Sequence, residues 1–235
     1  MLNNSKSKIY LISAIFILLF LLIKNRNYFK EDWRLKAYEV HGVDISHYQF
    51  DVDFKQLKND GIQFVFVKAT EGVTYKDNYF KKNWAELEEH DILRGAYHFY
   101  RPSVLAKRQA AEFIKTVPLQ SGDLPPVLDL EETDNRSGKI VLKGVKIWLE
   151  TIEAHYGVKP IIYVNQNYYN KYIKGNFEDY PIWIAAYRWN KPDVPAKDWE
   201  FWQYSDKGWR NGVKGRVDLN VFNGSYEDLK KWRIK

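Results

Sequence analysis

Two acidic side chains stand two residues apart near the middle of the chain, in the segment Pro126-Val-Leu-Asp-Leu-Glu131. If this segment is a β-strand, Asp129 and Glu131 point to the same face, because side chains two apart on a strand do so. Two carboxyl groups on a partly buried face repel each other when both are ionised, and burial also disfavours their charge. One of the two should therefore keep its proton near neutral pH and be available as a general acid. The simpler alternative is that Glu131 begins a solvated loop while Asp129 pairs with a base such as Lys68.

Two further acids accompany β-rich runs elsewhere in the chain. Asp44 lies in Val43-Asp-Ile-Ser-His-Tyr-Gln49, at the end of the first such run, and Asp218 lies in Gly215-Arg-Val-Asp-Leu-Asn220, at the end of the last. An Asp at such a place could instead cap a turn, and Asp218 could pair with Arg216 or Lys214. Four acids brought to one place would suit glycoside hydrolysis, in which one acid protonates the leaving oxygen and others stabilise the transition state.

The elements that must position these acids alternate between short β-rich runs and longer helical stretches, which predicts βα units around a mainly parallel sheet. Five strand–helix units are followed by three strands, so the expected fold is α/β, an irregular TIM-like barrel of eight strands, with a doubly wound open sheet as the alternative. The expected strands are 38–45, 63–69, 93–100, 126–130, 160–165, 181–187, 200–204 and 217–222. The expected helices are 54–59, 78–89, 105–116, 141–155 and a short one at 168–173.

Polar and aromatic side chains gather where these strands end, which is where barrel enzymes carry their chemistry. Aromatic faces with a polar handle suit stacking on sugar rings, although core packing is the usual role of any single one. The expected catalytic residues are Glu131, Asp129, Asp44 and Asp218, and the expected substrate-binding residues are Tyr97, Tyr100, Tyr163, Trp183, Tyr187, Trp202, Gln203, Lys68 and Glu71.

The composition narrows the partners. The net charge of +6 suits an anionic partner such as nucleic acid, a membrane surface or an acidic wall polymer. Basic residues are scattered among aromatic ones with no recognisable nucleic-acid motif, so we expect no nucleic-acid partner. Cysteine is absent and the five His residues do not fall at ligand spacing, so we expect no metal.

The N-terminus carries an apolar run from Ile9 to Ile23, interrupted by Ser13 and flanked by basic residues. About 15 residues are short for a hydrocarbon core of about 30 Å and suit a signal peptide. The residues after the run offer no small-x-small cleavage site, so we expect a retained single-pass anchor, with a secreted protein as the alternative. Residues 1–35 then form the anchor and linker, and residues 36–235 form the catalytic domain.

Beyond about residue 40, the chain resembles glycoside hydrolase family 25, the Chalaropsis-type lysozymes. The motifs that carry the resemblance stand in the family's order: Asp44-Ile45, Gln49, Gly61, Phe66-Val-Lys68, Thr70-Glu-Gly72, Tyr75, Asp77, Gly95-Ala-Tyr-His-Phe99, Asp129-Leu-Glu131, Trp183-Ile-Ala-Ala-Tyr187, Trp202-Gln-Tyr-Ser205 and Val217-Asp-Leu-Asn220. One position departs from the pattern, because Phe50 follows Gln49 where the family usually has a small residue such as Gly. We expect Phe50 to narrow or reshape the groove near Asp44.

The resemblance implies a flattened (β/α)5(β)3 barrel that cleaves the β-1,4 bond between N-acetylmuramic acid and N-acetylglucosamine without a cofactor. It also implies that Glu131 is the acid and later the base, that the substrate's own acetamido oxygen is the nucleophile, and that Asp129 orients that group. The expected partner is the peptidoglycan glycan strand, met outside the cell by a monomer. The rival functions are a chitinase-like or hexosaminidase activity, which shares only the short acid pair, and a non-catalytic wall-binding module.

Overall fold

The computed structural model describes residues 10, 13–14, 35–187 and 191–235. The chain divides into two units, Met1–Ala37 and Tyr38–Lys235, and each is considered by itself. In the first unit, a 3-10 helix, η1 (Leu35–Ala37), precedes the boundary. The predicted anchor at 9–23 lies outside the described residues apart from Tyr10, Ser13 and Ala14. Within the described residues, no helix combines the length and apolarity needed to cross a membrane.

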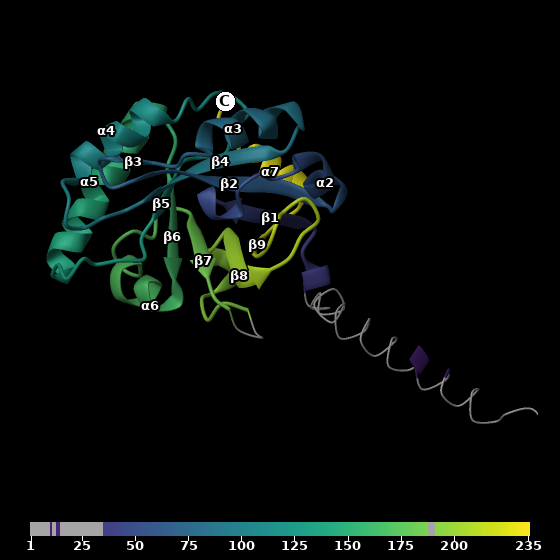
Figure 1. The fold of residues 1–235 in the computed structure, drawn as a ribbon. Helices are drawn as coiled ribbons and strands as arrows, with labels where there is room; N and C mark the ends of the chain where they lie inside the picture. The colour runs from purple at the N-terminus through teal and green to yellow at the C-terminus, as the bar shows by residue number, and fades with distance from the viewer. Residues whose placement is uncertain (1–9, 11–12, 15–34, 188–190) are drawn as a thin grey trace, which may run out of the picture. The chain divides into compact units, whose positions relative to one another are not determined.

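The second unit is built on a closed barrel (Figure 1). Its sheet has the order β1-β9-β8-β7-β6-β5-β4-β2-β3, and pairing of β1 with β2 closes eight of these strands into a ring, with β3 appended to β2. All neighbours around the ring are parallel except β9, which is antiparallel to both β1 and β8. The strands are β1 (Val40–Ile45), β2 (Ile62–Glu71), β3 (Tyr75–Lys76), β4 (Leu93–Phe99), β5 (Val127–Asp129), β6 (Ile161–Asn165), β7 (Ile182–Ala185), β8 (Phe201–Gly208) and β9 (Val217–Phe222).

Helices connect the parallel strands on the outside of the ring, and Figure 1 shows α4 and α5 running beside each other at one side. Local signals fix their ends: the Asp53 side chain accepts a hydrogen bond from Gln56 N at the start of α2, and Gly157 ends α5 in the left-handed conformation that glycine adopts most readily. The helices are α2 (Phe54–Asn59), α3 (Phe80–Glu89), α4 (Ala106–Thr116), α5 (Gly138–Tyr156), α6 (Gln166–Tyr168) and α7 (Tyr226–Lys231), with η2 (His47–Gln49), the π-helix η3 (Tyr169–Ile173) and η4 (Ala196–Asp198).

Aromatic side chains fill the interior of the barrel. Phe66 stacks on Trp183 with ring centroids 4.6 Å apart and meets Phe201 edge-on at 5.3 Å. Glycines make room for such rings: a Cβ added at Gly95 would lie 2.5 Å from the Phe66 ring, and one at Gly42 would lie 2.4 Å from the Phe64 ring. The core therefore depends on alternating large and small side chains.

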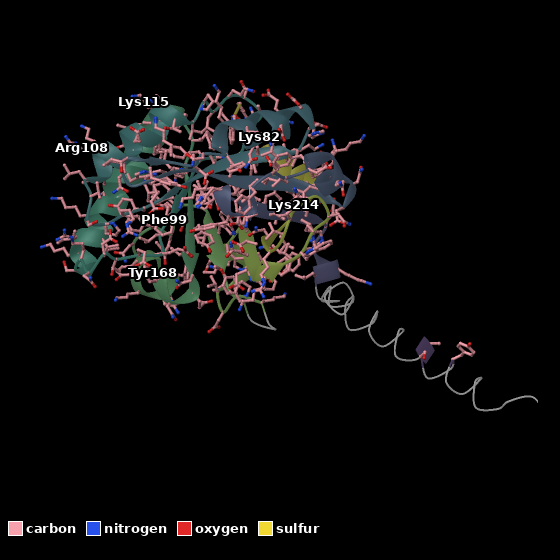
Figure 2. The ribbon with its side chains drawn as sticks, in the orientation of Figure 1. Lys82, Phe99, Arg108, Lys115, Tyr168 and Lys214 are labelled. Atoms are coloured by element: carbon pink, nitrogen blue, oxygen red, sulfur yellow. The ribbon has the colours of Figure 1, made fainter. Side chains whose placement is uncertain are left out.

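The expected α/β barrel is confirmed, and the alternative of an open sheet is wrong because β1 pairs with both β2 and β9. The short β3, the C-terminal α7 and the 3-10 helices η1, η2 and η4 were not anticipated. Basic side chains are spread over several elements, as the sequence indicated: Figure 2 labels Arg108 and Lys115 on α4, Lys82 on α3 and Lys214 in the loop before β9.

Candidate active site

A pocket with a volume of about 280 Å³ lies where β1, β5 and the other parallel strands end. Ten of the residues singled out in the sequence line it: Asp44, Lys68, Tyr97, Asp129, Glu131, Tyr163, Trp183, Tyr187, Gln203 and Asp218. All four acids thus reach one site from three strands, β1, β5 and β9, with Glu131 two residues past the end of β5.

Asp218 reaches this site by a route that the sequence analysis misjudged. It was expected at the C-terminal end of the last strand, yet it is the second residue of β9, whose start lies at this end because β9 runs antiparallel to β1. Asp218 lies directly opposite Asp44 in that pairing. The reversed direction of β9 therefore pairs the two acids across neighbouring strands.

Asp44 is the most heavily hydrogen-bonded of the four acids. Its side chain is buried, with the residue 7% exposed, and Oδ2 accepts hydrogen bonds from Gln203 Nε2 at 2.8 Å and Asn220 Nδ2 at 2.7 Å. Burial raises the pKa of Asp44, and these two hydrogen bonds oppose the rise.

Asp218 shares a hydrogen bond with Asp44. Burial, followed by the charge of Asp44, raises the pKa of Asp218 to about 8. Since Asp44 already accepts from two amides, we assign the proton to Asp218, which donates to Asp44. The pair carries one negative charge at neutral pH and holds it on Asp44.

Asp129 and Glu131 lie together on the pocket side of β5. Asp129 is 6% exposed, and its Oδ1 is buried with no hydrogen-bond partner among the described groups. Burial and then the charge of Glu131 raise the pKa of Asp129 well above its usual range. Burial also raises the pKa of Glu131. The repulsion between two carboxylates that the sequence suggested is present, and it favours a protonated carboxyl group at this site.

The Tyr163 hydroxyl connects Glu131 to the side-chain amide of Gln203. Its oxygen lies 3.2 Å from Glu131 Oε1, to which it donates, and 2.7 Å from Gln203 Oε1. A hydrogen bond from Tyr163 favours the carboxylate form of Glu131, so it opposes the rise in the pKa of Glu131 that burial causes. Gln203 in turn donates to Asp44, so Tyr163 and Gln203 link Glu131 to Asp44.

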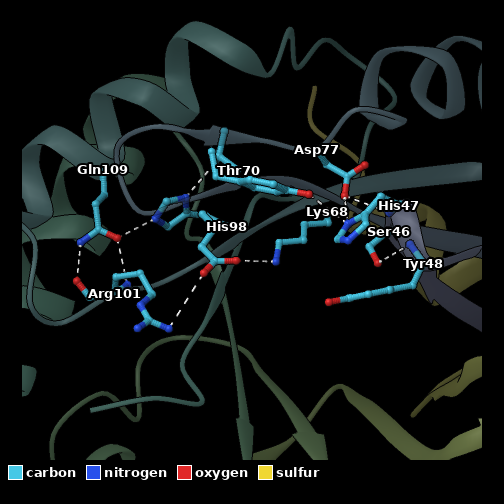
Figure 3. A network of polar contacts seen from close by, with 11 residues as sticks. Ser46, His47, Tyr48, Lys68, Thr70, Asp77, His98, Arg101 and Gln109 are labelled. Carbon is cyan, nitrogen blue, oxygen red and sulfur yellow. Dashed lines mark hydrogen bonds and ion pairs between the residues drawn. The ribbon is translucent and has the colours of Figure 1, made fainter. Parts of the chain in front are cut away.

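Lys68 supplies the positive charge of the pocket. Its Nζ pairs with Glu71 Oε2 at 2.8 Å, an ion pair that Figure 3 marks with a dashed line at Lys68, and lies 4.8 Å from the centroid of the Phe99 ring. The ammonium charge opposes the rise in the pKa values of Asp129 and Glu131. Glu71 also lies 3.9 Å from Arg101, and it is not among the residues that line the pocket. The position of Glu71 suits holding the Lys68 ammonium in place, and a direct contact of Glu71 with the sugar stays a prediction.

Two predicted aromatic contacts also lie outside the pocket. Tyr100 is 1% exposed, and its hydroxyl approaches Gly144 on α5. Trp202 is buried, and its Nε1 donates to Ala186 O at 3.0 Å. The reason is that side chains alternate between the two faces of a strand. Tyr97 and Gln203 point into the pocket, so Tyr100 and Trp202, which lie an odd number of residues away from them, point toward the outer layer.

Five further residues line the pocket that were not among the expected site residues: Ile45, Ser46, Tyr48, Gln49 and Phe99. Ile45 ends β1, and three others lie in the turn after it, where the Ser46 side chain and Gln49 cap the helix η2 reciprocally. The same alternation predicts that Phe99, two residues after Tyr97, points into the pocket. Phe50 is not among the residues that line the pocket, and its effect on the groove near Asp44 stays a prediction.

A polar network supports the pocket from the side of β2 and β4 (Figure 3). Asp77 Oδ2 accepts from His47 N at 2.9 Å and contacts His47 Nδ1 at 3.0 Å, so the segment after β3 holds the turn after β1. His98 points to the outer layer, where its ring lies 2.7 Å from Thr70 Oγ1 and 3.0 Å from Gln109 Oε1. Burial lowers the pKa of His98 to about 4, so it is neutral in the folded protein.

Comparisons with known proteins agree with this site. Residues 43–213 match the profile of the glycosyl hydrolases family 25. The protein YegX of Escherichia coli strain K12 is 44% identical over 198 residues, which cover 82% of this chain and 73% of that protein. Lysozyme M1 of Streptomyces globisporus is 34% identical, with coverage of 79% and 68%. The structure of a family 25 glycosyl hydrolase from Bacillus anthracis superposes with a TM-score of 0.78 at 38% identity, covering 83% of this chain and 94% of that one. This chain therefore belongs to the glycosyl hydrolases family 25.

Proposed function

We propose that the protein is a peptidoglycan hydrolase, an N-acetylmuramidase that cleaves the β-1,4 bond between N-acetylmuramic acid and N-acetylglucosamine. Similarity to Lysozyme M1 and to an N,O-diacetylmuramidase of Arthroderma benhamiae, 31% identical, supports the substrate class. The observation that carries the proposal is the pair Asp129 and Glu131, both with raised pKa values, in the pocket of a family 25 barrel.

In this proposal Glu131 is the general acid. Its carboxyl donates a proton to the glycosidic oxygen while the bond between that oxygen and C1 of N-acetylmuramic acid breaks. The carbonyl oxygen of the substrate's own acetamido group forms a bond to C1 on the opposite face. Glu131, now a carboxylate, takes a proton from a water molecule whose oxygen attacks C1, and the bond between C1 and the acetamido oxygen breaks. Two displacements at C1 retain its configuration.

Asp129 is the partner of the acetamido group in this scheme. Its buried Oδ1 lacks a hydrogen-bond partner, which is costly unless a ligand supplies a donor. The acetamido N–H is such a donor, and the negative charge of Asp129 would offset the positive charge that forms when the acetamido oxygen bonds to C1. Asp44 then keeps Gln203 and Tyr163 in position around Glu131.

The test compares the full chain with Glu131→Gln on purified peptidoglycan, with released fragments reduced by borohydride and identified by mass spectrometry. We expect reduced muramic acid ends from the wild type, and a rate lower by about 10²–10⁴ in the variant. Reduced glucosamine ends would assign a glucosaminidase instead. Binding without release of fragments by either protein would point to a wall-binding module.

The apolar run at 9–23 supports a proposal for where the enzyme acts. It would hold the exported enzyme at the membrane as a monomer, with the catalytic unit on the side of the wall, and keep its cleavage sites close to the membrane. Recovery of the protein in the membrane fraction of the cells supports this, and recovery in the culture medium contradicts it.

A further inference from the structure

Phe50 adopts a backbone conformation that an aromatic residue rarely adopts. Its φ is 52° and its ψ is −131°, in a region that glycine reaches freely and that a Cβ disfavours. A bulky side chain in such a conformation is a strained position, and strain of this kind clusters at functional sites.

The surrounding structure holds Phe50 in this conformation from both sides. Before it, the Phe50 amide donates to His47 O at 3.1 Å, and Gln49 Nε2 donates to Arg216 O at 3.2 Å. After it, Asp51 is paired with Lys82 of α3. The conformation is thus imposed by the turn, and the ring is displayed as a result.

The displayed ring faces solvent beside the pocket. Phe50 is 59% exposed, and it follows directly on Gln49, which lines the pocket. Its ring meets Tyr79 edge-on, with centroids 6.4 Å apart. Tyr48, 72% exposed, lines the pocket, and its ring lies against that of His47 in a tilted arrangement, with centroids 4.0 Å apart.

Asp77 keeps the two segments that carry these rings together. Its Oδ2 contacts His47, next to Tyr48, and its Oδ1 accepts from Tyr79 N at 2.9 Å. Figure 3 shows Asp77 and His47 in contact, with Tyr48 beside them. Tyr48, which lines the pocket, and Tyr79, which meets Phe50, are therefore carried by two segments that one buried carboxylate holds together.

We propose that Phe50, with Tyr48 and Tyr79, forms an aromatic platform that binds a further saccharide unit of the glycan strand beyond those held in the pocket. The inference rests on the proposed function, because it takes the occupant to be the strand itself. A pocket of about 280 Å³ lies just below the usual range for ligand sites, about 300–1,000 Å³, so a polymer must continue past it. The apolar face of a sugar ring matches an exposed aromatic ring. Phe50 is thereby a specificity-determining residue that favours long strands.

The experiment compares kcat/KM on long soluble glycan strands with kcat/KM on a tetrasaccharide of the same repeating unit. Phe50→Gly removes both the ring and the strain, whereas Phe50→Leu removes the ring and keeps the Cβ. We expect the ratio of long-strand to tetrasaccharide kcat/KM to fall about three- to tenfold in both variants, with the loss mainly in KM. Phe50→Tyr should restore the ratio.

Thermal stability separates this role from a structural one. Phe50→Gly should raise the Tm by about 2–5 °C because glycine adopts this positive φ without strain. The same variant should show a lower preference for long strands. Asp91→Gly is the matched control, since Asp91 has the same φ of 52° in the turn before β4, and it should leave the ratio unchanged. A wild-type ratio in both Phe50→Gly and Phe50→Leu overturns the platform.

A binding measurement distinguishes failure of the proposed function from failure of the platform. If the wild type hydrolyses neither substrate, co-sedimentation with insoluble peptidoglycan still decides the inference, using Glu131→Gln with and without Phe50→Gly. Weaker retention of the double variant supports the platform, and equal retention overturns it.

Discussion

Asp44 and Asp218 lie opposite each other across β1 and β9, two neighbouring strands that run in opposite directions. Two acids in such a position would repel if both were ionised. They are instead joined by a hydrogen bond, with the proton on Asp218 and the charge on Asp44. Their titration is therefore coupled to the stability of the barrel at its point of closure.

The first prediction follows from the raised pKa of Asp218. This group titrates near 3.8 in the unfolded chain and at about 8 in the folded protein. Between these pH values the unfolded chain has lost a proton that the folded protein keeps. The contribution of Asp218 to the free energy of unfolding is therefore fully present below pH 3.8 and is lost as the pH rises to about 8. The amide in Asp218→Asn can still donate to Asp44 but does not titrate. As the pH rises over this range, we expect the Tm of the variant to fall less than that of the wild type, with a difference on the order of 5 °C. Parallel Tm profiles for the two proteins would contradict this.

A second prediction concerns the hydrogen bond from Tyr163 to Glu131. This bond stabilises the carboxylate and so opposes the rise in the pKa of Glu131. Tyr163→Phe should raise that pKa further, and the alkaline limb of kcat/KM, which reports loss of the acid's proton in the free enzyme, should move to higher pH. Tyr187→Phe is the control, because Tyr187 donates to Gln203 Oε1 and not to Glu131. If the alkaline limb moves equally in both variants, Tyr163 has no specific role in setting the pKa of Glu131.

The third prediction sets activity against stability at Asp129. Folding raises the pKa of Asp129 well above its usual range, so this carboxyl opposes folding at neutral pH, and Asp129→Asn should raise the Tm there by about 2–5 °C. The same change removes the charge proposed to balance the acetamido intermediate, so kcat should fall by about 10²–10³. The two measurements are a thermal melt and a turnover assay on the same preparation. A less stable variant with near-normal kcat would refute the proposed role.

Much of this site could be read from the chain because the strand ends carry polar residues that a buried parallel strand would not otherwise tolerate. Asp44, Asp129 and Glu131 each follow an apolar run, and the runs meet at one end of the barrel. Alternation along a strand was used for Asp129 and Glu131 but not for the other strands. Applied to β4, it would have kept Tyr97, added Phe99 and removed Tyr100.

Other features depend on contacts that no local pattern encodes. The direction of β9 is set by the hairpin that joins it to β8 and by its pairing with β1, so the position of Asp218 at the start of its strand could not be derived from its own segment. The same holds for Asn220, which reaches Asp44 from a residue 176 positions away. The positive φ of Phe50 is fixed by Arg216 and Lys82, both distant in sequence.

The last prediction tests the packing that holds the site in place. Gly95 lies in β4, where a Cβ would be 2.5 Å from the Phe66 ring and 3.2 Å from Leu124, and the Phe66 ring stacks on Trp183, which lines the pocket. Gly95→Ala should therefore lower the free energy of unfolding by about 1–3 kcal/mol, and the Tm by roughly 2–10 °C, as overpacking of a core does. Gly138→Ala is the matched control, because a Cβ there meets only Tyr172 at 3.5 Å, and alanine favours the first turn of α5. Because Phe66 transmits the displacement to Trp183, Gly95→Ala should also raise KM, whereas a stability loss with unchanged KM would show that the core yields away from the pocket.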